Sequence, residues 1–348
     1  MSHRCVRGAL GAAAVCFVLA VPFAGSANAQ VMMDLGFGPI VVEPVMMAGD
    51  PDGTPPDSPA NRVDPNTSDS RFAGVGSLRL ASNSGTFICS AAAISDRHIL
   101  TAAHCLDLFG SNGTIDLTPD QVTFNLNAGG NLTSQITASR LSIHPDYTGF
   151  ANPVVNDDIA VITLSQPLPE GTPIYDIHWD PLPLGTEIIS AGYGRSGTGI
   201  SGFTTGASFT VKRIGGNEID AVSLDDEGGG LAEVFSFDFD APDGSNGQLG
   251  GPSLGNDIET SFGGGDSGGP SFIDVNGELK IVGVNTFRFS FSGGPASPLF
   301  GSGSGGILVS GYQDYVGDFV PEPASMVTWA GLGLVAGWQI RRRRKKAA

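Results

Sequence analysis

The central part of this chain is a succession of short apolar segments separated by glycine, asparagine and proline. From Phe72 onward these segments follow one another closely, and no long stretch has helical periodicity. Apolar runs bounded by turn-forming residues predict strands, and many of them in series predict an all-β barrel or sandwich. The 51 glycines and 23 prolines among 348 residues agree with many turns. We expect strands at residues 74–80, 86–94, 98–102, 121–127, 135–143, 159–164, 186–192, 208–213, 233–239, 270–275 and 278–287.

One glycine-rich stretch, residues 263–270, surrounds the pair Asp266 and Ser267. Glycine permits turns that other side chains forbid, so the serine hydroxyl can be presented outward while nearby amides converge on one point. A plain surface turn and a phosphate-binding loop are the alternatives. The phosphate loop fails, because no Gly-Lys-Ser/Thr is present and no helix is predicted to follow.

A candidate base and a candidate carboxylate lie far upstream of this serine. His104 follows a predicted strand, and Asp158 directly precedes another. A serine hydroxyl is a weak nucleophile that needs a base within hydrogen-bond reach, and that base needs a third group to orient it. The order histidine, aspartate, serine is one of the known orders of this constellation.

These three segments together resemble the trypsin/chymotrypsin-like serine proteases. The matching motifs are Ala-Ala-His-Cys at 102–105, Asn-Asp-Asp-Ile-Ala at 156–160 and Gly-Asp-Ser-Gly-Gly-Pro at 265–270, and the resemblance spans about residues 72–319. It implies two six-stranded antiparallel barrels with the active site between them. It also implies a short C-terminal helix near residues 309–316.

The resemblance assigns roles to individual residues. Ser267 is the nucleophile, His104 takes and returns its proton, and Asp158 holds the imidazole in the correct tautomer. Asp157 is the rival for this last role, but the family places its aspartate directly before Ile-Ala. The amides of Gly265 and Ser267 form the oxyanion hole.

The sequence says less about which side chains the substrate pocket accepts. Ser261, six positions before the nucleophile, indicates a preference for small or apolar side chains, and Thr286 matches a serine that supports the catalytic aspartate. Arg288 stands at the pocket rim. Asp266 matches an aspartate that pairs with a new amino terminus after zymogen cleavage. The candidate for this new amino terminus is residues 72–76, which cleavage after Arg71 would release. Their sequence departs from the Ile-Val-Gly-Gly with which the family begins.

Cysteine use indicates an oxidising compartment. Of the 4 cysteines, Cys5 and Cys16 lie in a segment that reads as a signal peptide, which leaves Cys89 and Cys105. The resemblance implies a disulfide between these two, and a pair of free thiols is the alternative. A bridge of this length stabilises a fold by about 3 kcal/mol.

The two ends of the chain resemble export signals. Residues 1–29 have a basic start, an apolar middle and a small-residue cleavage site, as secretory signals do. Residues 30–71 are expected to be a disordered linker or propeptide, because 50–69 are dense in polar residues and proline. The 72–319 protease domain is followed by 320–348, where Pro-Glu-Pro precedes the apolar segment 326–340 and a basic end.

This C-terminal arrangement resembles the bacterial PEP-CTERM sorting tail. The resemblance implies an exosortase-type enzyme as a partner that removes the tail, and delivery to the cell envelope or extracellular matrix of a Gram-negative-type bacterium. A plain single-pass membrane anchor is the alternative, although the apolar segment is short of the roughly 20 residues that a span needs.

The exported part is strongly acidic. Residues 31–320 contain ten basic and 34 acidic side chains, a formal net charge of about −24. Such a surface excludes nucleic-acid partners. Acidic residues within 225–243 could bind calcium, but solvated loops are the favoured interpretation, and we predict no metal and no cofactor.

The sequence therefore predicts a secreted serine endopeptidase that acts on proteins or peptides through an acyl-enzyme intermediate. A catalytically inactive, protease-like binding module of the extracellular matrix is the alternative, and an esterase on the same scaffold is a third interpretation.

Overall fold

The computed structural model describes residues 40–41, 46–109, 112–149, 156–291 and 297–320. The predicted signal peptide and the apolar segment 326–340 lie outside these residues. Within the described part of the chain, no helix is long and apolar enough to cross a membrane.

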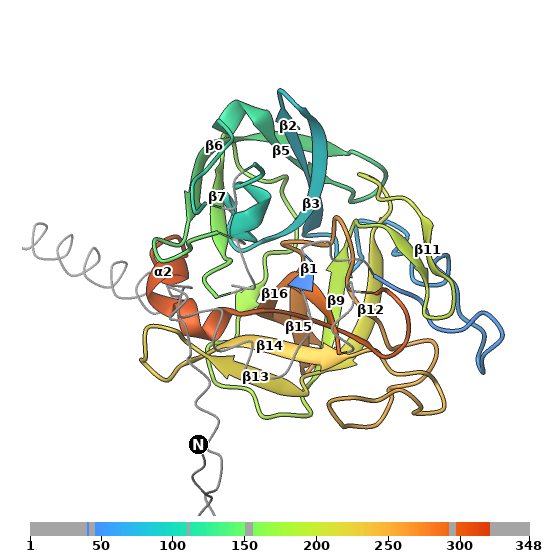
Figure 1. The fold of residues 1–348 in the computed structure, drawn as a ribbon. Coiled ribbons are helices and arrows are strands. Elements are labelled where there is room, and N and C mark those ends of the chain that lie inside the picture. Colours follow the sequence, from blue (N-terminus) through green and yellow to red (C-terminus); the bar gives the residue numbers. More distant parts are fainter. Residues whose placement is uncertain (1–39, 42–45, 110–111, 150–155, 292–296, 321–348) are drawn as a thin grey trace, which may run out of the picture.

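The first half forms a closed antiparallel barrel of six strands, drawn in teal and green in Figure 1. Its strands are β2 (Val75–Ser82), β3 (Gly85–Ala93), β4 (His98–Thr101), β5 (Val122–Leu126), β6 (Ser134–Ile143) and β7 (Ala160–Leu164), in the order β2-β3-β4-β7-β6-β5. Alternate residues of these strands point inward, so Leu78, Phe124 and Ile162 are fully buried in the barrel core. A short 3-10 helix, Ala103–Cys105, follows β4, and another, Pro119–Gln121, precedes β5.

The second half is built on a nine-stranded sheet, which stands where the resemblance implied a second six-stranded barrel. Its order is β12-β9-β15-β16-β17-β14-β13, with β1 and β8 paired to β16. The strands are β1 (Ile40–Val41), β8 (Asp176–Ile177), β9 (Glu187–Gly192), β12 (Arg213–Glu218), β13 (Ala221–Leu224), β14 (Ala232–Asp238), β15 (Pro270–Val275), β16 (Glu278–Ser290) and β17 (Ser302–Leu308). A separate hairpin joins β10 (Ser196–Thr198) to β11 (Gly202–Thr205).

The chain then returns to the first barrel. A 3-10 turn, Val309–Tyr312, leads into the short helix α2 (Gln313–Gly317), beside β6 and β7 in Figure 1. The hydroxyl of Tyr315 donates a hydrogen bond to the carbonyl of Ser142 in β6 at 2.8 Å. The predicted all-β class and short C-terminal helix are confirmed.

Several features differ from the strand predictions, which did not include β1, β8, β10, β11, β13 or β17. The segment predicted at 208–213 is turn and coil, and β12 begins only at Arg213. The glycine-rich strand β17 was not predicted, because Gly303, Gly305 and Gly306 carry no β-forming side chain. A Cβ at Gly303 would collide with the ring of Phe289 on β16, so the close approach of these strands requires glycine there.

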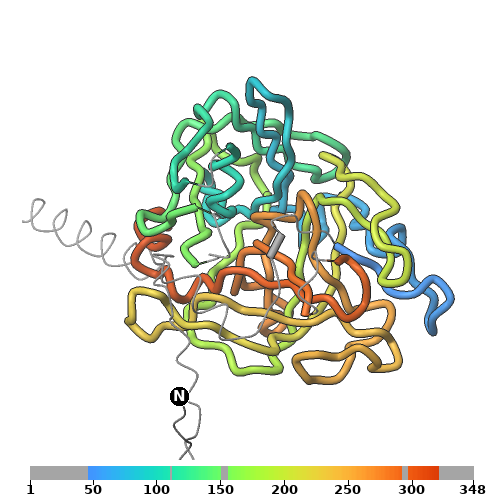
Figure 2. Tube along the Cα trace, in the orientation of Figure 1, coloured from blue at the N-terminus to red at the C-terminus, as the bar shows by residue number. Residues whose placement is uncertain are grey.

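Residues 46–71 fold as a series of turns against the second half, although their composition predicted poor order. Figure 2 shows this blue segment beside the chain near β11 and β12. The guanidinium of Arg62 contacts the carboxylate of Asp57 at 2.7 Å, and both side chains are almost fully buried. Arg62 also donates to three carbonyls of residues 256–259. The three carbonyls lie far from Arg62 in sequence, so local composition cannot reveal these contacts.

Candidate active site

His104 and Asp158 meet at the edge of the first barrel. His104 lies in the 3-10 turn after β4, and Asp158 lies just before β7, the strand that pairs with β4. The ring Nδ1 of His104 is 2.7 Å from Oδ2 of Asp158, and the His104 main-chain N–H donates to Oδ1 at 2.7 Å. The tautomer with its proton on Nδ1 donates to this carboxylate and has Nε2 as its acceptor nitrogen.

Asp157, the rival carboxylate, points elsewhere. Its Oδ1 lies 3.1 Å from Nδ1 of His144. Asp157 has a φ of +60°, a left-handed conformation that few residues other than glycine, asparagine and aspartate adopt. This turn directs two consecutive carboxylates to two different histidines.

Ser267 lies in the predicted glycine-rich loop, which is held between the two halves. Ser90 of β3 donates its N–H to the carbonyl of Ser267 at 2.8 Å, and Gly268 donates to the carbonyl of Asn285 in β16 at 2.8 Å. Gly268 has a φ of +77°, and a Cβ there would collide with the hydroxyl of Thr101. Glycine at 268 is therefore required both for its conformation and for space.

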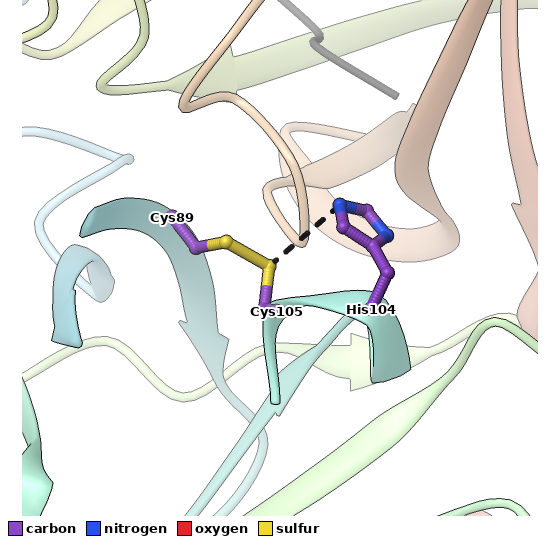
Figure 3. Close-up of side chains that lie close together, drawn as sticks. All are labelled: Cys89, His104 and Cys105. Atoms are coloured by element: carbon purple, nitrogen blue, oxygen red, sulfur yellow. Dashed lines mark hydrogen bonds between the residues drawn. A yellow bond between two sulfur atoms is a disulfide. The ribbon is translucent and has the colours of Figure 1, made fainter. Parts of the chain in front are cut away.

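His104 and Ser267 line one pocket of about 390 Å³, together with Cys105 and Gly265. Figure 3 shows the imidazole edge facing the Cys89–Cys105 disulfide. The Cys105 sulfur lies 4.0 Å from His104 Nε2 and 3.6 Å from the carbonyl oxygen of Ser267. The Cys105 sulfur therefore contacts both the imidazole ring of His104 and the loop that carries Ser267.

The disulfide between Cys89 and Cys105 is present, with an S–S distance of 2.02 Å. This pairing confirms the implication of the resemblance, and it joins β3 to the turn that carries His104. Because both sulfurs are consumed in the bridge, Cys89, His104 and Cys105 do not form a metal site although their ligand atoms are close together.

The predicted oxyanion-hole donors are the main-chain N–H groups of Gly265 and Ser267. The carbonyl of Gly264 accepts a hydrogen bond from Arg195 at 2.9 Å, and the carbonyl of Asp266 accepts one from Gly269 at 2.8 Å. In a trans peptide the N–H points opposite to the carbonyl, so the N–H groups of Gly265 and Ser267 point away from these bonds. Among the described residues, neither N–H donates a main-chain hydrogen bond.

The carboxyl of Asp266 anchors this loop from beneath. Its Oδ1 accepts the N–H of Gly194 at 2.8 Å, while Oδ2 is buried and accepts no hydrogen bond of normal geometry from the described residues. Complete burial raises the pKa of Asp266 to about 7, against the opposing effects of Gly194, the charge of Arg213 and the N–H of Met46.

Met46, and not Phe72, is the residue that approaches Asp266. Met46 is buried, and the next residue, Met47, donates its N–H to the carbonyl of Ser261 at 3.0 Å. The carbonyl of Phe72 instead accepts a hydrogen bond from the Lys212 side chain at 2.6 Å. The segment 46–49, Met-Met-Ala-Gly, thus lies beside Asp266, where the sequence had suggested residues 72–76. The sequence pattern that could have identified this segment is two apolar residues followed by two small ones, as in the family's Ile-Val-Gly-Gly.

The predicted pocket residues are buried in the second half. The hydroxyls of Ser261 and Ser304 lie 2.7 Å apart, and Ser304 was not predicted. Thr286 donates its hydroxyl to the carbonyl of Val284 at 3.1 Å rather than to Asp158. Arg288 is almost fully buried, with its guanidinium carbon 4.9 Å from the ring centroid of Phe203.

Comparison with known proteins adds the following. A family model described as Trypsin matches residues 70–301. Among solved structures, the protease Anisep from Arthrobacter nicotinovorans is 16% identical, with 68% of this chain and 90% of that chain covered and a TM-score of 0.44. The thermostable serine protease AL20 from an extremophilic microorganism is 17% identical, with 70% and 95% covered and a TM-score of 0.44. A search of curated proteins found no match.

Proposed function

Because this chain belongs to the trypsin family, we propose that it is an exported serine endopeptidase whose catalytic residues are Ser267, His104 and Asp158. The observation that carries the proposal is the pair of 2.7 Å contacts by which Asp158 fixes both the ring and the main chain of His104. His104 and Ser267 also line the same pocket. A buried carboxylate that orients a base beside a serine is the arrangement that activates a hydroxyl.

The reaction proceeds in two transfers. The hydroxyl oxygen of Ser267 attacks the peptide carbonyl carbon while its proton passes to Nε2 of His104, and the oxyanion accepts hydrogen bonds from the N–H groups of Gly265 and Ser267. Collapse of this intermediate breaks the carbon–nitrogen bond, and Nε2 gives its proton to the departing amine. Water then attacks the acyl group by the same route, which releases the acid and restores the serine hydroxyl.

The environment of the pair supports this chemistry. Asp158 is fully buried, and the His104 side chain is only 11% exposed, so their interaction is shielded from water. The disulfide ties the histidine turn to β3, whose Ser90 binds both the Ser267 carbonyl and, through its hydroxyl, the Gly265 carbonyl at 2.8 Å. Histidine and serine are thereby positioned by one strand.

Export and sorting are part of the proposal. Residues 1–29 act as a secretory signal, and an exosortase-type enzyme recognises the Pro-Glu-Pro tail at 320–348. The mature protein is then released to the cell envelope or extracellular matrix, where it cleaves proteins or peptides. The disulfide is consistent with an oxidising compartment.

A fluorophosphonate probe, which forms a covalent bond with an activated serine, tests the proposal. We expect the protein to be labelled, and Ser267→Ala to abolish labelling, whereas Ser84→Ala, on an exposed turn, leaves it intact. Cleavage of a peptide library should disappear in the same variant. A folded mature protein that neither reacts with the probe nor cleaves peptides would instead be a binding module, and labelling with cleavage of esters alone would indicate an esterase.

A further inference from the structure

A group of carboxylates lies beside the turn that carries Asp158. Asp157, Asp226 and Glu227 each offer one oxygen, and these oxygens lie within 4.8 Å of one another. Asp157 belongs to the first half, whereas Asp226 and Glu227 lie in the loop between β13 and β14 of the second half. Glu233, on β14, is close by, because Asn156 Nδ2 lies 3.2 Å from Asp226 Oδ1 and 3.5 Å from Glu233 Oε2.

Two buried oxygens at this place have no hydrogen-bond donor. Asn156 and Asp157 are each 1% exposed. Asn156 Oδ1 and Asp157 Oδ2 accept no hydrogen bond from the described residues. A buried acceptor without a partner costs about 1–3 kcal/mol, and more when it is charged, so such groups in a native protein usually have a partner.

The negative charge of the group is also poorly balanced. Within the described residues, no lysine or arginine forms an ion pair with Asp226, Glu227 or Glu233. The one positive candidate is His144, which contacts Asp157. The carboxylates therefore repel one another and favour any cation that enters.

We propose that Asp157, Asp226 and Glu227 bind a calcium ion, and that the unpartnered, buried Oδ2 of Asp157 is one of its ligands. Every donor is an oxygen, which suits a hard cation and not zinc. Calcium accepts six to eight carboxylate and amide oxygens in flexible geometry, whereas magnesium demands near-ideal octahedral ligands and retains several waters. The ion joins the β13–β14 loop to the turn that holds Asp158, and so ties the two halves together behind the catalytic histidine.

Thermal unfolding tests the site without any need for catalysis. All variants are made in a Ser267→Ala background, which prevents self-digestion, and each is melted in EGTA and in about 10 mM calcium chloride, above the Kd range of extracellular sites. We expect calcium to raise the Tm of the parent by about 3–10 °C, as for a ligand at 10- to 100-fold excess over its Kd in a domain of this size. Magnesium at the same concentration should raise it less.

The double substitution Asp226→Asn with Glu227→Gln removes two of the ligand charges. We expect its Tm in EGTA to equal or exceed that of the parent, because repulsion is relieved, and its response to calcium to be lost. Glu170→Gln, which removes an exposed carboxylate elsewhere, should respond as the parent does. Absence of a calcium shift in the parent, or an equal shift in the double variant, would overturn the site. Isothermal titration with calcium chloride should give one ion per chain for the parent.

Discussion

Gly194 donates its main-chain N–H to Oδ1 of Asp266 across the base of the glycine-rich loop, at 2.8 Å. The contact leaves no room for a side chain, because a Cβ at Gly194 would lie 2.8 Å from the carboxyl carbon of Asp266. The next residue along the loop is Ser267. The carboxyl that Gly194 holds therefore fixes the backbone from which the candidate nucleophile and the amides of the oxyanion hole project.

The first prediction concerns the pH dependence of stability. The pKa of Asp266 is about 7 in the folded chain and near 3.8 in the unfolded chain. Between these values the folded state keeps a proton that the unfolded state releases, so the contribution of Asp266 to the free energy of unfolding is present below pH 4 and is lost as the pH rises towards 7. The loss amounts to at most about 4 kcal/mol.

The matched variant is Asp266→Asn, whose amide oxygen can still accept the hydrogen bond from Gly194 but does not titrate. Denaturant unfolding of both full-length proteins between pH 4 and pH 8 isolates the contribution, since the other acidic groups are common to both. The advantage of the parent over the variant should shrink with rising pH. A difference that stays constant across this range would contradict the assignment.

The second prediction concerns the start of the active protein. The Met46 N–H already faces Asp266, and Met47 is bonded to Ser261. Cleavage just before Met46 would replace this neutral amide with an ammonium group, which interacts far more strongly with a buried carboxylate. We expect sequencing of the active protein to find its amino terminus at or next to Met46, and not at Phe72.

The residues before Met46 give this cleavage a second consequence. Ile40 and Val41, in β1, pair with Phe289 and Arg288 of β16, which places the uncleaved chain at the predicted rim of the substrate pocket. A chain that begins at Met46 should therefore have the higher kcat/KM towards peptides, and acetylation of its amino group should reduce kcat. Full activity in a chain that still carries residues 30–45 would exclude this form of activation.

The third prediction compares two glycines in the left-handed region. Gly268, in the active-site loop, has a φ of +77°, and an added Cβ would collide with Thr101 and the Ser90 carbonyl. Gly277, in the β15–β16 turn, has a φ of +93° and nothing within 4 Å of an added Cβ. Both alanine variants suffer backbone strain of about 1–2 kcal/mol, but only Gly268→Ala adds a clash with main-chain and strand atoms.

Urea unfolding and peptide hydrolysis distinguish the two. Gly277→Ala should lose about 1–2 kcal/mol of stability and keep its activity, because its turn lies away from the pocket. Gly268→Ala should lose more stability and most of its activity. Similar behaviour of the two variants would mean that the loop carrying Ser267 tolerates displacement.

The sequence was sufficient for the fold class and for pairing His104 with Asp158, because the motifs that predict both are local. Alternating apolar runs indicate strands wherever side chains can show the alternation, as in β2 and β6. Strand β17 could not be predicted, because Gly303, Gly305 and Gly306 have no side chains to show the alternation. Phenylalanine rings of the neighbouring strands nevertheless require glycine at these positions.

Long-range pairing explains the other differences. Arg62 and Asp57 look like ordinary members of a polar linker, yet the carbonyls that bind Arg62 are contributed by residues about two hundred positions away. The position of Met46 beside Asp266 depends on the same packing. Likewise, the grouping of Asp157 with Asp226 depends on how two halves of the chain meet, and neither segment alone has the spacing of a calcium-binding loop.

The last prediction separates two neighbouring carboxylates. Asp158 accepts both 2.7 Å contacts from His104, whereas Asp157 lies 3.1 Å from His144. Asp158→Asn preserves the shape but can donate its amide N–H to Nδ1, which moves the ring proton to Nε2 and abolishes its role as a base. We expect kcat to fall by about 10⁴-fold, as for the equivalent change in a related protease.

Asp157→Asn keeps the His104 contacts and should lower kcat by tenfold at most in the presence of calcium. Active-site titration with the fluorophosphonate should follow the same order. An equal loss in both variants would mean that the two carboxylates act together, and a greater loss in Asp157→Asn would transfer the orienting role to that residue.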